Sequence, residues 1–378
     1  MSAAWRRYGA RVSFAWDHSG KPLPVVARTV VDTRVRRLVS VVSRPAGGGP
    51  SLGYAGVPDG MVKILQMLDR QRERTGVGTA GHVCAQVTAR EVFGRHRLPD
   101  ADLVAVTGTA AQVAALPTRS ALVLPYRLHA VVAADPAWRR RMSTGERQWC
   151  ETRIRRRKLR IEVAADRTDF DFFYDRIHLP TMRNRHGERA RSESRVRAYE
   201  CLFRPGLLMI VTDGESRLAG ALAHWSQGGR TALTPRLGGV LDGSAELHAE
   251  GLLRVMSYLI LDWAERHGVQ HVDFSGLEAW LGNGLYGYKR RLTPHLVPPP
   301  DHRANLALWW HVRRDTAEVR DFLVANPVLE DLGDGTLRAV YFHDAHRPAR
   351  LDIPHTCANV RSTRLVDLDD LLDKELTP

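Results

Sequence analysis

A five-residue pattern, Gly-Val-x-Asp-Gly, occurs twice in this chain, each time just before the longest helix pattern of its half. The two copies lie at residues 56–60 and 239–243. Sheet strands precede each copy and another strand follows each helix, which is the order that a repeated structural unit produces. We therefore expect a tandem duplication: two similar mixed α/β domains, each a mostly antiparallel sheet flanked by helices.

The expected domains are residues 1–150 and 151–300, followed by an extension at 301–378. The length of 378 residues and the hydrophobic content of 44% allow two or three buried cores. A change in charge and pattern near residue 150 sets the first boundary, and a proline run at 298–300 sets the second. We expect the extension to cover one face of a domain or to shape a binding groove.

Local periodicity predicts the elements of each domain. In the first domain, strands are expected at 11–15, 24–31, 37–43, 82–87, 103–107 and 122–124, with a helix at 59–74. In the second, helices are expected at 169–177, 180–184 and 247–267, and strands at 161–163, 207–212, 218–225, 231–235 and 271–275. The extension is expected to hold strands at 307–312 and 337–342 and a helix at 316–325. Ser244 is the expected N-cap of the long helix, and Gly268 follows its end.

The cysteines and the apolar runs exclude several classes of protein. Cys84, Cys150, Cys201 and Cys357 are widely spaced and form no CxxC pair, so neither a disulfide framework nor a zinc site is expected. No stretch approaches the ~20 apolar residues of a membrane span. HExxH and GxxxxGK[ST] are absent, which argues against zinc hydrolases and nucleotide kinases. We expect a monomeric cytoplasmic protein with reduced thiols, no metal, no cofactor and no membrane partner.

Positive charge is in excess and is clustered. The chain holds 55 Lys and Arg against 42 Asp and Glu, a formal net charge of +13, which favours a polyanionic partner such as nucleic acid. One arginine-rich cluster runs from 138 to 160 and a second from 183 to 197. A GC-rich genome would also enrich arginine, and a run of charge is often only a solvated helix face. The pattern therefore leaves both interpretations open.

The segment HVDFSGLEAWLGNGLYGYKRRL, at residues 271–292, combines a polar strand face with a glycine-rich loop and a cationic end. Alternation along the strand directs Asp273 and Ser275 to the same face. Glycines then lead to the cationic residues 288–291, where backbone and positive charge can approach an anionic group. The structural alternative is that Asp273 satisfies a turn and the cations end a solvated helix.

Four segments together resemble the GNAT acyltransferase fold and, in their doubled arrangement, the Fem-type transferases. They are the basic helix at 142–163, the helix pair at 171–187, the signature with its long helix, and VDFSG…GLYGYKRRL at 272–292. The resemblance covers residues 142–292, reaches 1–141 only through the duplication, and does not cover 301–378. It implies tandem GNAT-like domains and a transferase that joins an aminoacyl group from aminoacyl-tRNA to an amine. A cell-wall precursor or a specialised metabolite is the implied small-molecule acceptor.

The resemblance and the local chemistry together imply roles for individual residues. Aminolysis of an aminoacyl ester needs cations near the developing oxyanion, a proton acceptor and a groove that excludes water. The expected catalytic residues are Lys289, Asp273 and His224. The expected substrate-binding residues are Arg183, Arg185, His186, Ser275 and Tyr288. The expected tRNA-binding residues are Arg290, Arg291, Arg153, Arg155, Arg156, Arg157 and Lys158.

Two departures from the family pattern keep other functions open. The glycine spacing of residues 236–246 differs from that of a CoA-binding loop, and Asp242 and Glu246 would repel a pyrophosphate. Residues 291–294 stand where the family closes with an aromatic residue and a glycine. The alternatives are an acyl-CoA-dependent N-acyltransferase and a non-catalytic RNA-binding protein of GNAT-like fold.

Overall fold

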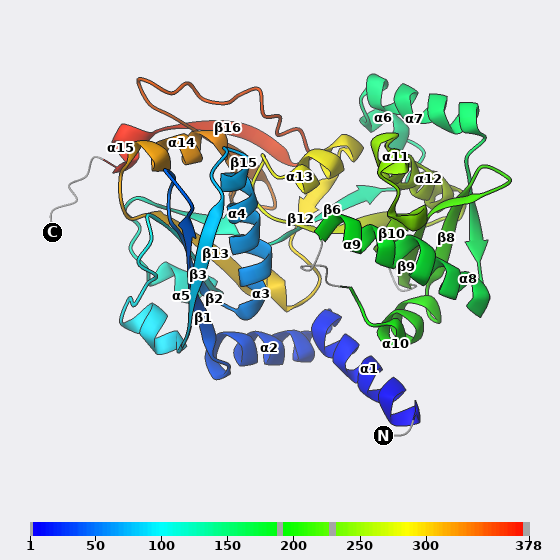
Figure 1. Ribbon diagram of the computed structural model, residues 1–378, viewed down its shortest axis with the longest axis horizontal. Coiled ribbons are helices and arrows are strands. Elements are labelled where there is room, and N and C mark those ends of the chain that lie inside the picture. The colour runs from blue at the N-terminus through cyan, green and yellow to red at the C-terminus, as the bar shows by residue number, and fades with distance from the viewer. Residues whose placement is uncertain (1–2, 187–191, 227–231, 373–378) are drawn as a thin grey trace. The chain divides into compact units, whose positions relative to one another are not determined.

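A computed structural model describes residues 3–186, 192–226 and 232–372, and Figure 1 labels its helices and strands. The chain divides into two compact units, each built from segments that are distant in the sequence. Unit 1 is Met1–Asp17, His129–Ser275 and Arg291–His295, and unit 2 is His18–Leu128, Gly276–Arg290 and Leu296–Pro378. This division differs from the sequence-based domains, because residues before 128 and after 296 belong to the same unit.

Unit 1 holds most of a seven-stranded mixed sheet, whose strands follow the order β12-β6-β11-β10-β9-β8-β7, with the short strand β12 (His295–Val297) at its edge. These strands are β6 (Leu128–Ala133), β7 (Arg160–Ala164), β8 (Leu207–Thr212), β9 (Arg217–Ser226), β10 (Ala232–Val240) and β11 (His271–Leu277). The neighbours from β7 to β10 are antiparallel. β10 and β11 are parallel, and they pair only at Ala232 with His271 and at Leu233 with Val272. The sheet therefore splits between β10 and β11 beyond these two pairs.

Helices of unit 1 enclose this sheet. They are α1 (Ala3–His18), α6 (Trp138–Arg141), α7 (Thr144–Arg157), α8 (Arg167–Phe172), η4 (Phe173–His178), α9 (Leu179–His186), α10 (Arg195–Arg197), η6 (Ala198–Phe203), η7 (Leu241–Gly243), α11 (Ala245–Ala249) and α12 (Leu252–Arg266). α12 packs against β7, β9 and β10. A buried cluster that includes Phe170, Phe173 and Leu202 joins α8, η4 and η6 to the apolar side chains of β8 and β9.

The long helix expected at 247–267 is two helices, α11 and α12. Ser244 caps α11 as predicted, since its side chain accepts a hydrogen bond from the Leu247 amide at 3.2 Å. Gly251 separates the helices with φ 78°, and a Cβ atom there would lie 2.4 Å from Cη2 of Trp149. The break therefore follows from a backbone position that only glycine fills at low cost, and the hydrophobic periodicity carries no sign of it.

Unit 2 has a second mixed sheet, with the order β3-β1-β2-β4-β13-β5. Its strands are β1 (Leu38–Pro45), β2 (Leu52–Gly56), β3 (Thr79–Val87), β4 (Leu103–Thr109), β5 (Ala121–Pro125) and β13 (Leu306–Val312). A three-stranded sheet contains β14 (Val328–Asp331), β15 (Leu337–His343) and β16 (Val360–Asp367). The helices are α2 (Pro22–Val30), η1 (Val31–Val35), α3 (Pro58–Gly60), η2 (Met61–Leu65), α4 (Gln66–Glu73), η3 (Arg90–Gly94), α5 (Ala110–Ala114), α13 (Gly284–Lys289), η8 (Arg290–Leu292), η9 (His302–Asn305), α14 (Ala317–Ala325) and α15 (Leu368–Leu372).

The C-terminal segment completes the sheet of unit 2. β13 lies between β4 and β5 and is antiparallel to both. A strand inserted inside a sheet is not an add-on that covers a face, so the segment from residue 301 is structurally part of this unit. The predicted strands at 307–312 and 337–342 and the helix at 316–325 are confirmed as β13, β15 and α14 within one or two residues.

Two strands expected near the N-terminus are wrong. Residues 11–15 belong to helix α1, and residues 24–31 lie in α2 and the turn η1. Pro22 occupies the first turn of α2, where its fixed φ favours a helix. Apolar residues in both segments recur at three- and four-residue spacing, which is the helical period. The strand prediction rested on the intrinsic β propensity of the β-branched residues, and the spacing of the apolar residues outweighs it.

Both units follow the expected order of antiparallel strands, signature, helix and parallel strand. In unit 1 the parallel pair is β10 and β11, and in unit 2 it is β2 and β4, paired over four residues. Unit 2 departs from the pattern because β3 intervenes between α4 and β4 and pairs with β1. The predicted fold class is confirmed as far as two α/β units with mixed, mostly antiparallel sheets flanked by helices.

Close packing explains why the signature ends in glycine in both copies. A Cβ atom at Gly60 would lie 2.0 Å from Oη of Tyr54, which donates a hydrogen bond to the Val57 carbonyl at 2.7 Å. A Cβ atom at Gly243 would lie 2.7 Å from the Pro180 carbonyl, and Gly243 also has φ 63°. Each glycine is therefore required by a neighbouring element of its own unit.

We predict opposite effects for two helical glycines. Gly60→Ala is expected to lower the free energy of unfolding by about 1–3 kcal/mol, because the methyl group displaces the Tyr54 ring from its buried site. Gly145→Ala in α7 is the control, since no atom lies within 4 Å of its added methyl group. This variant is expected to gain up to about 1 kcal/mol from helix propensity. Urea unfolding measures both, and equal stability of the two variants would contradict the packing argument.

Candidate functional site

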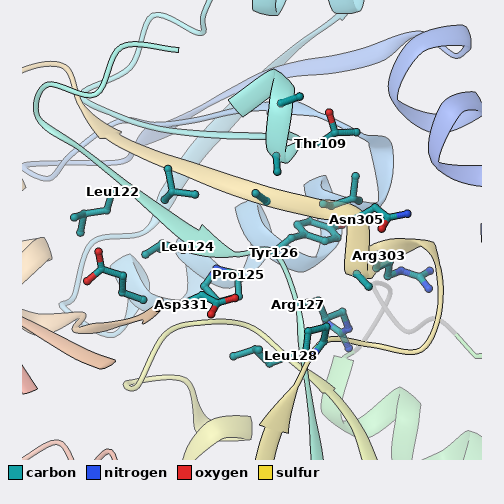
Figure 2. Close-up of a pocket in the computed structure, with 18 of the residues that line it drawn as sticks. Thr109, Leu122, Leu124, Pro125, Tyr126, Arg127, Leu128, Arg303, Asn305 and Asp331 are labelled. Atoms are coloured by element: carbon teal, nitrogen blue, oxygen red, sulfur yellow. The ribbon is translucent and has the colours of Figure 1, made fainter. Parts of the chain in front are cut away.

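Unit 2 contains a pocket of about 990 Å³ along strand β5 and the residues that follow it (Figure 2). Every residue from 121 to 128 lines this pocket, as do the first residues of β13. Leu122 and Leu124 supply apolar walls, and Arg303 and Asp331 lie at opposite sides of the view in Figure 2. This volume lies in the range of small-molecule sites, about 300–1,000 Å³.

A cluster of charged groups surrounds the Tyr126 side of the pocket. Oδ2 of Asp59 accepts hydrogen bonds from Oη of Tyr126 and from Nε of Arg303, both at 3.1 Å. Nζ of Lys63 lies 3.1 Å from Oδ1 of the same carboxylate. Arg303 also donates to Asp301 at 2.7 Å. The second-last residue of the signature thus holds a network of one phenol and two cations, which we call the Asp59 cluster (Asp59, Lys63, Tyr126, Asp301 and Arg303).

The pKa values of the Asp59 cluster follow from burial and charge. Burial alone would raise the pKa of Asp59, but Lys63 and Arg303 outweigh it and hold that pKa below its usual range. Burial, and then the charge of Arg127, lower the pKa of Lys63. Burial, and then the charge of Asp59, raise the pKa of Tyr126 well above its usual value. At neutral pH the cluster therefore holds an ionised carboxylate and a protonated phenol.

A second polar network in unit 2 is formed by the segment that the sequence singled out. Arg127 donates to Oε1 of Glu278 at 2.5 Å, and Asn283 donates to Oε2 of Glu278 at 3.0 Å. Lys289 is only 5% exposed, and its Nζ donates to the Gly276 carbonyl at 2.8 Å. A Cβ atom at Gly276 would lie 2.0 Å from Nε of Arg127, so this glycine lets the guanidinium lie against the backbone.

Tyr288 and Arg290 flank Lys289 at the end of α13 and are partly exposed. The structure brings these three predicted residues together on one short helical segment of unit 2. Lys289 is turned into the protein, whereas its neighbours retain access to solvent. Lys289 also holds the backbone of its own segment, through the Gly276 carbonyl.

In unit 1, the predicted Asp273 and Ser275 meet at a bend of β11. Ser275 has φ 65°, and its amide donates to Oδ1 of Asp273 at 2.7 Å. Its hydroxyl donates to the Pro235 carbonyl of β10 at 3.3 Å. Nδ1 of His129, on β6, lies 2.8 Å from Oδ2 of Asp273, and both side chains are buried. If Nδ1 carries the proton, Nε2 of His129 is left as a hydrogen-bond acceptor.

The other predicted acid–base and substrate-binding residues lie elsewhere in unit 1. His224 is a half-buried residue of β9 that stands opposite Thr234 of β10, and burial, followed by Arg236, lowers its pKa. Arg183 and Arg185 are exposed on α9. His186 ends that helix, but its side chain lies outside the described residues, as do Arg189 and Arg191 of the second arginine cluster.

The predicted tRNA-binding residues of α7 and its C-terminal cap, and Arg291, differ in whether they have a partner within the protein. Arg153 stacks on Trp149 with its guanidinium carbon 3.6 Å from the ring centroid, and Arg157 pairs with Glu250. Arg291 is exposed and lies 3.4 Å from Glu146. The remaining three, Arg155, Arg156 and Lys158, are exposed and have no carboxylate partner among the described residues.

Sequence reasoning missed several polar residues of these networks. His129 bonds to a residue 144 positions away, and its only local signal is one imidazole inside the apolar strand LHAVVA. Asp59 and Lys63 were visible as part of a signature and a helix, with no sign that a phenol and Arg303 would converge on them. Arg127 and Glu278 are also distant in sequence.

The described residues show neither a clustered metal site nor a spanning helix. Within residues 3–186, 192–226 and 232–372, no three His, Cys, Asp or Glu side chains gather so that they could hold a metal ion. The four cysteines are unpaired thiols, and only Cys84 is exposed. No helix in the described part of the chain has both the length and the hydropathy that crossing a membrane requires.

No family model and no curated protein matches this chain. Among solved structures it is similar to L-PGS from Bacillus licheniformis, with 11% identity and a TM-score of 0.36 over 83% of this chain and 94% of that one. It is similar to FemX, with 12% identity and a TM-score of 0.38 over 79% and 94%. It is also similar to a GCN5-related N-acetyltransferase from Sphaerobacter thermophilus, with 15% identity and a TM-score of 0.31 over 71% and 74%.

The duplicated signature supplies a matched pair of variants. Asp59→Asn is expected to lower the free energy of unfolding at pH 7 by about 1–3 kcal/mol, because Lys63 and Arg303 lose their shared counter-ion. This range is discounted because the Asp59 side chain is 37% exposed. Asp242→Asn removes an exposed pair with Arg176 and is expected to cost at most about 1 kcal/mol.

The pH dependence of this difference tests its electrostatic origin. The folded pKa of Asp59 is lowered, so its stabilising effect is complete above the ordinary carboxyl pKa of about 4 and is lost as pH falls through the folded pKa. The stability gap between wild type and Asp59→Asn should therefore shrink in urea titrations below about pH 4. A gap that stays constant at low pH would mean that packing, not charge, explains the loss.

Proposed function

We propose that this protein is a Fem-type transferase of GNAT-like fold that takes an aminoacyl group from aminoacyl-tRNA and forms an amide with an amine acceptor. The main support is one observation in unit 1. Arg155, Arg156 and Lys158 form an exposed group of cations at the end of α7, without a carboxylate partner among the described residues.

Several neighbouring arginines of unit 1 are neutralised, whereas these three cations have no such ion pair among the described residues. Arg254 is paired with Glu146, Arg139 with Asp262 and Glu265, and Arg195 with Asp171 and Asp175. The helix dipole favours cations at a helix C-terminus, which explains their position. The dipole, however, does not supply a full negative charge such as the carboxylates that pair with the neighbouring arginines. The phosphate backbone of an RNA would supply that charge.

The proposed reaction exchanges an ester for an amide. The acceptor nitrogen attacks the ester carbonyl carbon, the new C–N bond forms, and the C–O bond to the tRNA ribose breaks. The nitrogen gives up one proton, and the leaving ribose oxygen takes one up. In unit 1, the buried His129 and Asp273 are the pair we propose for accepting the proton, with Asp273 holding the imidazole tautomer.

We assign the remaining predicted residues to positioning and binding. Lys289 holds the Gly276 backbone, and through it the place of Arg127, so that it shapes the segment that carries Tyr288 and Arg290. Arg183, Arg185 and His186 remain proposed acceptor contacts on α9, and His224 remains a proposed proton acceptor. The pocket of unit 2 has the size of an acceptor site, and its cations are largely balanced by Asp59, Asp301 and Glu278. That balance favours a polar but weakly charged acceptor.

An acyl-CoA donor is the second candidate, and one observation favours it. The sequence argument against CoA rested partly on the charge of Asp242. In the structure this carboxylate receives two hydrogen bonds from Arg176, at 2.6 and 2.7 Å, so its charge is neutralised. If CoA raises the melting temperature of the protein and tRNA does not, this second candidate replaces the first.

The direct test is incubation with charged, radiolabelled tRNA and a panel of amines, with and without ribonuclease. The proposal predicts labelled amide only while intact aminoacyl-tRNA is present, because the donor ester is attached to the RNA. His129→Asn and Asp273→Asn should each reduce the transfer rate by about 10²–10⁴-fold, the usual contribution of a general base. Transfer that survives removal of all tRNA would refute a tRNA-dependent reaction.

The cations of α7 are tested by a charge-matched comparison. Replacing Arg155, Arg156 and Lys158 by alanine should weaken tRNA binding by about tenfold or more and reduce the slope of log K against log salt by about two. The control replaces Arg160, Arg266 and Arg350, which are exposed but paired, and changes the net charge equally. Equal losses in both triple variants, measured by filter binding, would show that net charge alone attracts the RNA.

A further inference from the structure

Exposed apolar side chains are concentrated near the N-terminus. Among the described residues, fourteen large hydrophobic side chains are exposed, and half of them lie between residues 5 and 35. They are Trp5, Tyr8, Val12, Leu23, Val26, Val30 and Val35. A segment of less than a tenth of the chain thus holds half of its large exposed apolar groups, which is a sign of an interaction surface.

Helix α1 has two distinct faces. Trp5, Tyr8 and Val12 are 67%, 63% and 51% exposed and share one face, since they are three and four residues apart. The other face is bound within unit 1: Arg11 donates to Glu200 at 2.6 Å, and Phe14 packs against the buried cluster of α8, η4 and η6. The face opposite the apolar stripe therefore attaches the helix to unit 1.

Helix α2, described by itself in unit 2, repeats this arrangement. Leu23, Val26 and Val30 are 84%, 58% and 41% exposed and have the same spacing as the stripe of α1. Its opposite face carries the buried Thr29, whose Oγ1 accepts a hydrogen bond from Asn305 at 2.9 Å. Two consecutive helices thus each present an apolar stripe that is largely exposed to solvent.

The same segment is strongly basic. Residues 1–37 contain eight Lys or Arg and two acidic residues, Asp17 and Asp32. Both carboxylates are already paired, Asp17 with Arg197 and Asp32 with Arg28 and Arg36. An apolar stripe surrounded by unbalanced positive charge is complementary to a surface that is apolar beneath a layer of negative charge.

We propose that the apolar stripes of α1 and α2 insert into the surface of a bilayer rich in anionic lipid, so that the protein docks to a membrane peripherally. Tryptophan and tyrosine favour the interface between headgroups and acyl chains, and arginine favours anionic headgroups. RNA would not explain the stripe of α2, because leucine and valine neither stack on bases nor bind phosphate. This departs from the expectation of no membrane partner, which rested on the lack of a spanning segment.

The test is flotation of the full chain with vesicles of phosphatidylcholine alone and with vesicles containing 30% phosphatidylglycerol. Binding is expected on the anionic vesicles, about tenfold tighter than on neutral ones, and is expected to weaken as salt rises. Trp5→Ser with Tyr8→Ser and Val12→Ser should reduce this binding about tenfold or more, and so should Leu23→Ser with Val26→Ser. Because these side chains are exposed, the variants should keep the wild-type urea midpoint.

The control replaces Val163 and Leu365 by serine, two exposed apolar residues outside the N-terminal segment, and should bind like wild type. Stripe variants that bind anionic vesicles as wild type does would overturn the proposal. So would light scattering that shows a dimer dissolved by the same substitutions, or tRNA binding lost together with the stripe. Vesicle binding needs no donor or acceptor, so its failure is distinct from failure of the proposed transfer reaction.

Discussion

Pairing of arginine with carboxylate is the interaction on which this structure depends. An unpaired guanidinium inside a protein is costly, so a chain with 55 Lys and Arg can fold only if its buried cations have partners. Arg72 is fully buried and is held by Asp69, Ser43, Thr79 and the Pro50 carbonyl. Among the exposed cations with no ion pair to a carboxylate in the described part of the chain are Arg155, Arg156 and Lys158 at the end of α7, where a partner outside the protein can supply the negative charge.

The sequence predicted what depends on neighbours along the chain. Ser244 caps a helix, and the signature precedes a helix in both units. It did not predict that β13 inserts between β4 and β5, because such pairing depends on strands about 200 residues apart. For α1 and α2 the sequence wrongly predicted strands. Their β-branched residues favoured strands, and the apolar residues at helical spacing are exposed, so they do not form a buried helix face.

In the candidate site, too, contacts between neighbouring residues could be predicted from the sequence, and contacts between distant segments could not. Asp273 accepts a hydrogen bond from the Ser275 backbone amide at a bend where Ser275 has φ 65°, which is the local turn contact that the sequence offered as the structural alternative. The partner of Asp273 is His129, which lies on another strand. Buried Lys289 donates to the Gly276 carbonyl, and the missing side chain of Gly276 leaves room for Arg127. The two copies of the signature have also diverged: Asp59 joins two cations and a phenol, whereas Asp242 forms one exposed pair.

The central claim is that the cations at the end of α7 meet RNA phosphate. Arginine-specific labelling with phenylglyoxal, read by mass spectrometry with and without aminoacyl-tRNA, tests it most directly. The account predicts that Arg155 and Arg156 are modified in the free protein and protected by tRNA, while buried Arg72 stays unmodified in both states. Equal modification of Arg155 and Arg156 at saturating tRNA would contradict it.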